Sequence, residues 1–127
     1  MFDDDDQFLA RLRDLASTLP GSAEKVSHGR PAFYTAKVFA YYGGSIKVDG
    51  VYVQHPHALI VLPDSADRQA LLEEDRVFLP AYLAPSGWIG VDLDDENNEW
   101  DEVAELLDAS YRLTASKRLV VELDRRG

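Results

Sequence analysis

Two histidines that bracket a proline are the first residues of this chain whose spacing suggests chemistry. His55 and His57 are two positions apart, so on an extended strand both imidazoles would lie on one face and could bind a metal ion together. A third ligand at a suitable spacing is not evident, and two histidines alone make a weak site. The favoured interpretation is a turn at Pro56 whose imidazoles face solvent, with no metal and no cofactor.

A short polar segment, Glu24–Pro31, is the second candidate. It holds His28 and Arg30, whose side chains could contact an anion. Neither phosphate-binding glycine motif, G-x-x-x-x-G-K-[ST] or G-x-G-x-x-G, occurs in the chain. The favoured interpretation is therefore that His28 and Arg30 bind loop carbonyls and carboxylates.

Carboxylates are concentrated in two runs, Asp3–Asp6 and Asp92–Glu96. They bind hard cations, but consecutive residues of a helix point in different directions, so Asp3–Asp6 alone builds no metal cage. The favoured interpretation places Asp4, Asp5 and Asp6 in the first turn of a helix, at the positive end of its dipole. Weak divalent-metal binding at either run is the alternative.

No catalytic constellation can be assembled from the nucleophiles and bases of the chain. The three histidines lie in one region and the serines are scattered, whereas a Ser/His/Asp triad needs its three groups to meet. We therefore predict that the protein is not an enzyme.

Length and composition favour one globular domain over residues 1–127. The chain is 46% apolar, but no apolar run approaches the ~20 residues that a membrane span needs. Its first residues are acidic where a secretory signal would be basic, and the absence of cysteine excludes disulfides and zinc–thiolate sites. We therefore expect a cytoplasmic protein without a membrane partner.

The charge of the chain is strongly and unevenly negative. The net charge is −10, and residues 92–108 carry nine carboxylates with no Lys or Arg. Only residues 20–50 and 109–127 have a positive balance. A nucleic-acid-binding module normally has a basic face, so this distribution counts against DNA binding unless the two basic segments share a surface.

Apolar periodicity predicts helices over residues 4–19, 65–75 and 99–113, and a short one over 117–123 before a frayed tail, Asp124–Gly127. In the third helix we expect Trp100 and Tyr111 to be largely buried, because they share one face with its other apolar residues. Residues of capping type precede three of these helices: Asp64, Asn98 (with Asp101 in the capping-box position) and Ser116.

Short β-rich segments predict an antiparallel meander. Residues 32–42 are expected to form two strands with a break at Thr35–Lys37, with one long strand as the alternative, and Gly43–Gly44 is expected to form a turn. Strands at 45–48 and 51–54 flank Asp49–Gly50, a strong hairpin signal. Pro56 is expected to end the ladder before further strands at 58–62 and 88–93. The predicted fold class is α+β, with an antiparallel sheet of about five strands and helices packed on one face.

Several segments, HGRPAF, KVFAYYGG, AYLAPSGWIGVDL and WDEVAELLDASYRLTASKRL, resemble the MmcQ/YjbR family from about Leu19 to Leu123. The most specific matches are Gly29–Pro31, Gly87–Trp88 and Ser110–Tyr111 with Lys117–Leu119, and none is a catalytic motif. The chain departs from the family pattern at residues 35–37, where relatives often have glycines, and at 114–116, where a proline is common.

The resemblance implies a fold similar to the bacterial frataxin-like (CyaY-like) proteins. This uncharacterised family is usually described as DNA-binding, with the sheet and its projecting hairpins called a double wing. On that reading basic side chains would neutralise phosphates, and Phe33, Tyr34, Tyr41 or Tyr42 could stack on bases. The candidate nucleic-acid-binding residues are Lys25, His28, Arg30, Lys37, Lys47, Lys117 and Arg118.

Two alternatives remain open at this point. One is an acidic protein-interaction or regulatory domain that meets a basic partner, and the other is the weak divalent-metal binder mentioned above, by analogy with the frataxin-like fold. The sequence leaves open the natural ligand, the oligomeric state and whether a pocket exists.

Overall fold

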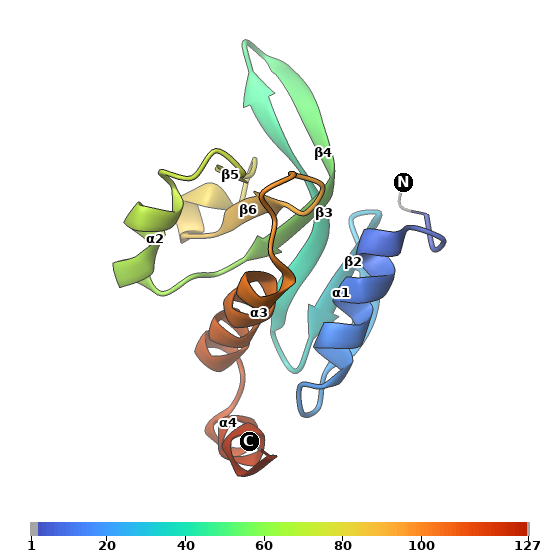
Figure 1. Ribbon diagram of the computed structural model, residues 1–127, viewed down its shortest axis with the longest axis vertical. Helices are drawn as coiled ribbons and strands as arrows, with labels where there is room; N and C mark the ends of the chain where they lie inside the picture. Colours follow the sequence, from blue (N-terminus) through green and yellow to red (C-terminus); the bar gives the residue numbers. More distant parts are fainter. Residues whose placement is uncertain (1–2, 127) are drawn as a thin grey trace.

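The computed structural model describes residues 3–126 and has four α-helices and one sheet (Figure 1). The six strands lie in the order β1-β2-β3-β4-β6-β5, and every neighbouring pair is antiparallel. The predicted α+β class is confirmed, with six strands in place of about five. The helices are α1 (Gln7–Ser17), α2 (Ser65–Leu71), α3 (Trp100–Thr114) and α4 (Lys117–Arg126), with a 3-10 turn η1 (Ala84–Ser86). The strands are β1 (Ala23–Ser27), β2 (Arg30–Tyr34), β3 (Val38–Val48), β4 (Val51–Val61), β5 (Val77–Phe78) and β6 (Ile89–Asp92).

Helices α1 and α3 cover one face of the sheet (Figure 1). Leu12 of α1 and Leu107 of α3 are buried in one core with Tyr42, Leu59 and Val91 of the sheet. Because successive strand residues point to opposite faces, their neighbours point away from the helices. We call that opposite side the helix-free face; it carries Ala32, Tyr41, Ile60 and Gly90.

The helical phase predicted for α3 is confirmed, with one correction. Tyr111 is fully buried, and Glu102 and Glu105 are exposed. Trp100 is only half-buried, because it is the first residue of the helix and lies at the margin of the core. The guanidinium of Arg11 covers its ring at 4.7 Å, a cation–π contact.

The start of α3 also differs from the prediction. The N-cap is Glu99, and no side chain makes a capping bond, so neither Asn98 nor Asp101 has the expected role. The amide oxygen of Asn98 instead accepts a hydrogen bond from Nη1 of Arg76 at 3.2 Å. Because its oxygen is bound to Arg76, the side chain of Asn98 does not accept from the free N–H groups of the first turn of α3.

The other caps behave largely as expected. Asp64 accepts from the N–H of Ala66, and Ser116 accepts from that of Leu119. Asp6 is the N-cap of α1 rather than a first-turn residue, so Asp3–Asp5 precede the helix and do not lie in it.

Three helices end two or more residues away from the predicted position. Helix α1 ends at Ser17 and α2 at Leu71, each earlier than predicted. Helix α4 continues through Arg126, so the expected frayed tail is wrong for residues 124–126, while Gly127 lies outside the described residues.

Strands β3 and β4 are each continuous over 11 residues, so the predicted turn at Gly43–Gly44 and the predicted end at Pro56 are wrong. Their pairing passes from Tyr42↔Leu59 to Gly44↔His55, so β4 advances four residues while β3 advances two. This irregularity is a bulge around Pro56, where a residue without an N–H is tolerated. The break at residues 35–37 is confirmed, whereas β5 was missed because two residues show no alternation.

The hairpin that joins β3 to β4 projects beyond the helices (Figure 1). Asp49 and Gly50 have φ of 51° and 81°, as a two-residue type I′ turn requires, so the predicted hairpin is confirmed.

We expect Gly50→Val to lower the free energy of unfolding by about 1–2 kcal/mol, because a β-branched residue is strained at positive φ. Urea denaturation would measure this. Gly50→Asn, which tolerates the conformation, is the control, and a Val variant as stable as that control would contradict the prediction.

Candidate nucleic-acid interface

The structure distributes the predicted basic residues over four regions. Lys25, His28 and Arg30 lie together on the β1–β2 hairpin. Lys37 and Lys47 lie at opposite ends of β3, about 33 Å apart at ~3.3 Å per residue. Lys117 and Arg118 begin α4, at the far end from the β3–β4 hairpin (Figure 1). These residues therefore do not form one site.

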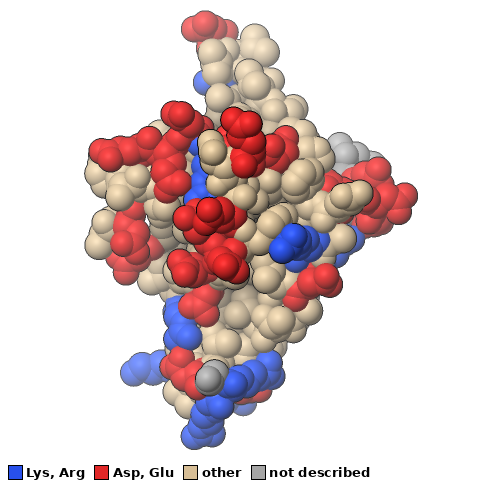
Figure 2. Space-filling model, viewed as in Figure 1, with Lys and Arg blue, Asp and Glu red and all other residues tan. Residues whose placement is uncertain are grey.

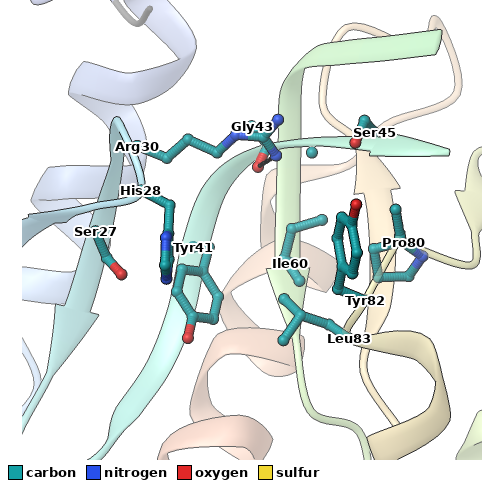
Figure 3. A pocket seen from close by; sticks show the side chains of 12 residues that line it. Ser27, His28, Arg30, Tyr41, Gly43, Ser45, Ile60, Pro80, Tyr82 and Leu83 are labelled. Carbon is teal, nitrogen blue, oxygen red and sulfur yellow. Dashed lines mark hydrogen bonds between the residues drawn. The ribbon is translucent and has the colours of Figure 1, made fainter. Parts of the chain in front are cut away.

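A pocket of about 520 Å³ lies on the helix-free face (Figure 3). His28 and Tyr41 form one wall, and Ile60 of β4 lies between this wall and the next. The opposite wall comes from the segment before η1 and consists of Pro80, Tyr82 and Leu83. The backbone N–H of Ala81 donates to the carbonyl of Ser45 at 2.8 Å, which anchors this segment on the sheet.

Arg30 is held along the edge of the pocket. Its Nη1 donates to the carbonyl of Gly43 at 2.8 Å, and its Nη2 to Oε1 of Gln54 at 3.3 Å. Arg30 was expected to bind a loop carbonyl. It does bind a carbonyl, but that carbonyl belongs to Gly43, at the irregular pairing within β3 and β4. His28 is exposed, at the tip of the hairpin. These bonds use two of the five guanidinium N–H donors, so three remain available at the pocket edge.

Aromatic rings accompany the basic residues on this side of the molecule. Nζ of Lys25 lies 4.7 Å from the ring of Tyr34, and Nζ of Lys47 lies 5.6 Å from the ring of Tyr52. Tyr52 in turn stacks on Tyr82 with ring centroids 6.0 Å apart. The contacts therefore extend from the pocket along the projecting hairpin.

Only two of the four aromatic residues proposed for stacking reach the surface. Phe33 and Tyr42 are buried in the core, whereas Tyr34 and Tyr41 are half-exposed on the helix-free face. Tyr82, which is 81% exposed, was not predicted. The feature of the sequence that could have indicated Tyr82 is its location in the irregular, proline-containing segment after β5.

The two central histidines do not form a solvent-facing turn. Nδ1 of His57 lies 2.9 Å from Oδ2 of Asp6 and 2.8 Å from the hydroxyl of Tyr42. His55 pairs with Asp92 at 2.8 Å and stacks on a phenylalanine of β5. The bulge in β4 allows them to take separate partners. Residues 3–126 contain no group of three or more His, Cys, Asp or Glu that could hold a metal ion, so the metal-binding alternative has no preformed cage.

The Asp6–Tyr42–His57 cluster joins α1 to the sheet, and its protonation states are set by its contacts. Burial opposes the charged carboxylate of Asp6, but hydrogen bonds from Tyr42 and from the N–H groups of Phe8 and Leu9, with His57 nearby, lower its pKa. Burial and the same carboxylate raise the pKa of Tyr42 well above its usual value. Asp6 is therefore a charged acceptor and Tyr42 a neutral donor. We regard the cluster as structural.

Helix α3, which carries much of the acidic segment 92–108, packs on the other side of the sheet from the pocket, whereas Asp92 of β6 alternates with Val91 onto the helix-free face and pairs with His55. Figure 2 shows the side that carries α1 and α3, where Asp and Glu spread across the centre while Lys and Arg gather at the end formed by α4. Arg76, only 6% exposed, pairs with Glu74 at 3.0 Å and with Glu102 at 2.5 Å. Part of the negative charge is thus neutralised within the helical layer.

No helix in the described part of the chain is long and apolar enough to cross a membrane.

A model of the YjbR family matches residues 17–113. The fold is similar to the crystal structure of the Deinococcus radiodurans protein DR2400, a DUF419 domain, with a TM-score of 0.64. The two chains are 23% identical over 91% of this chain and 87% of that one. No curated protein matches the chain.

Proposed function

This chain belongs to the YjbR family, and on that premise we propose that it is a non-enzymatic module that binds DNA through the helix-free face of its sheet. One observation carries the proposal. Lys25, Arg30 and Lys47 lie with exposed tyrosines on a surface that the acidic helix α3 does not share. Basic groups beside accessible rings are the combination that binds a nucleic-acid backbone and its unstacked bases.

The net negative charge does not prevent binding at this surface. Packed layers of a domain lie about 10 Å apart, and the screening length at physiological salt is ~8 Å. The carboxylates of α3 point away from the sheet, so they lie further from the helix-free face than that length. Their repulsion is therefore largely screened at Lys25 and Arg30.

The expected binding is weak, independent of sequence and dependent on salt. We would measure fluorescence anisotropy with labelled duplex and single-stranded DNA from low to physiological salt. Three phosphate contacts on duplex DNA should give a slope of about −2.7 in log K against log salt, at roughly 0.9 per contact. The double charge reversal Lys25→Glu with Arg30→Glu should abolish binding.

The matched control is Lys117→Glu with Arg118→Glu, which changes the net charge equally on α4. We expect this variant to bind nearly as well as the wild type. If both double variants lost the same amount of DNA affinity, the total charge of the protein, rather than the helix-free face, would determine binding. If the folded protein binds neither DNA at low salt, the proposal is wrong.

A basic protein partner is the second candidate. It is supported by an acidic hollow beside Arg76, at the junction of the α2–β5 segment with the start of α3. Its lining includes Glu73, Glu74, Asp75, Asp95, Glu99 and Glu102. This candidate becomes the better one if no DNA binding is detected.

A further inference from the structure

We propose that the pocket on the helix-free face binds a single nucleotide unit, with its base between Tyr82 and Tyr41 and its phosphate on Arg30. The inference rests on the proposed DNA binding and makes it more specific. A strand bound there would have one unstacked base in the pocket, so single-stranded DNA is preferred over duplex. The same site would accept a free deoxynucleoside monophosphate.

The size and lining of the pocket fit such a ligand. Its volume of about 520 Å³ lies within the ~300–1,000 Å³ that small-molecule sites occupy. Ile60, Pro80 and Leu83 supply apolar surface beneath and beside the ligand. Among the lining residues that the structure describes there is no Asp or Glu, although the chain has 23 of them. The lining of the pocket therefore lacks the carboxylates that make the molecule negative overall, and it suits an anion.

The aromatic walls provide a place for the base. Tyr41 and the imidazole of His28 stand on one side, and the ring of Tyr82 stands on the other (Figure 3). Tyr82 has φ of 70°, which is unfavourable for a residue with a side chain. It is kept there by its stacking on Tyr52 and by the hydrogen bond of Ala81 to the sheet. A large, exposed ring held in a strained conformation at a pocket is suited to stacking on a ligand.

Arg30 provides the phosphate contact. Gly43 and Gln54 hold its guanidinium on the pocket edge through two hydrogen bonds. The remaining N–H groups can bind phosphate oxygens, and a planar guanidinium favours a two-pronged contact. Because the group is already positioned, little side-chain freedom is lost when the phosphate binds.

Tryptophan fluorescence gives a direct test. Trp88 packs edge-on against Tyr41 at 5.6 Å, so it reports on the pocket wall. In a Trp100→Phe background, Trp88 is the one remaining tryptophan. Titration with deoxythymidine monophosphate should give a saturable change, and thymidine, which lacks the phosphate, should bind more weakly.

Two variants and two matched controls locate the site. Arg30→Gln and Tyr82→Ala should each lower the affinity for the monophosphate about tenfold or more, from the loss of the phosphate contact or of base stacking. Arg126→Gln on α4 and Leu79→Ala, an exposed residue outside the lining, should leave it unchanged. Circular dichroism would show that each variant is folded.

The proposal is overturned if no saturable change occurs, or if Arg30→Gln and Tyr82→Ala bind the monophosphate as the wild type does. Fluorescence anisotropy with labelled DNA tests the proposed DNA binding separately from the nucleotide pocket. DNA binding without monophosphate binding would overturn the pocket and leave the DNA-binding surface. Monophosphate binding without DNA binding would overturn the proposed function and leave the pocket.

Discussion

Replacing Tyr111 by alanine is expected to lower the free energy of unfolding by about 3–5 kcal/mol, the usual cost of truncating a large buried aromatic residue. Tyr111 is 0% exposed and lies in the last turn of α3, within the core between that helix and the sheet. Its ring packs edge-on against Phe39 of the sheet at 5.4 Å. Its hydroxyl donates to the carbonyl of Pro20 at 2.5 Å, beyond the end of α1. One side chain therefore connects α3, β3 and the segment after α1.

Urea denaturation of three variants would separate these contributions. Tyr111→Phe keeps the ring and loses the hydrogen bond, which leaves a buried carbonyl unpaired at a cost of about 1–3 kcal/mol. Leu113→Ala, two residues further on and 51% exposed, should cost no more than about 0.5 kcal/mol. If Tyr111→Ala proved as stable as Leu113→Ala, the position assigned to this side chain in the core would be wrong.

Replacing Asp6 by alanine is expected to cost about 2–4 kcal/mol, because the carboxylate serves two structures at once. It caps α1 through the N–H groups of Phe8 and Leu9, which contributes about 1 kcal/mol. It also accepts a hydrogen bond from Tyr42 at 2.5 Å, and hydrogen bonds to charged groups contribute about 1.5–3 kcal/mol. Asp5→Ala, an exposed neighbour, is the control and should change stability little.

This contribution should depend on pH in a defined direction. The pKa of Asp6 is lower in the folded protein than in the unfolded chain. Its stabilisation is therefore complete above the unfolded pKa of about 3.9 and is lost as the pH falls through the folded pKa. The stability difference between wild type and Asp6→Ala should shrink in acid. A difference that stays constant from neutral pH down to acid unfolding would contradict this assignment.

Much of the fold was predictable because its signals are local. Helical periodicity located α1 and α3, and the Asp49–Gly50 turn located the hairpin. The failures involve partners distant in the chain. Nothing near Asn98 indicates that Arg76 will bind it, and nothing near Pro56 indicates that the opposite strand will accommodate a bulge. Such features depend on which segments become neighbours.

The candidate site was predictable only in part for the same reason. His28 and Arg30 stood out as polar residues in a short basic segment, but the opposite wall of their pocket comes from a segment some fifty residues later. Among adjacent aromatic residues, Tyr41 is accessible and Tyr42 is buried. Alternation predicts that two such neighbours face opposite sides, but it does not indicate which side the helices cover. The packing of α1 and α3 decides that.

The bulge around Pro56 also has an evolutionary consequence. It separates the pairing register of the outer hairpin, residues 45–54, from that of the inner strands. Adding or removing two residues in each strand of the hairpin moves the tip, keeps the remaining side chains on their own faces and leaves the pairing of Tyr42 with Leu59 intact. An unpaired deletion would instead reverse which side chains of that strand face each side. Homologues should therefore differ in the length of this hairpin by balanced steps, while the inner strands keep a constant length.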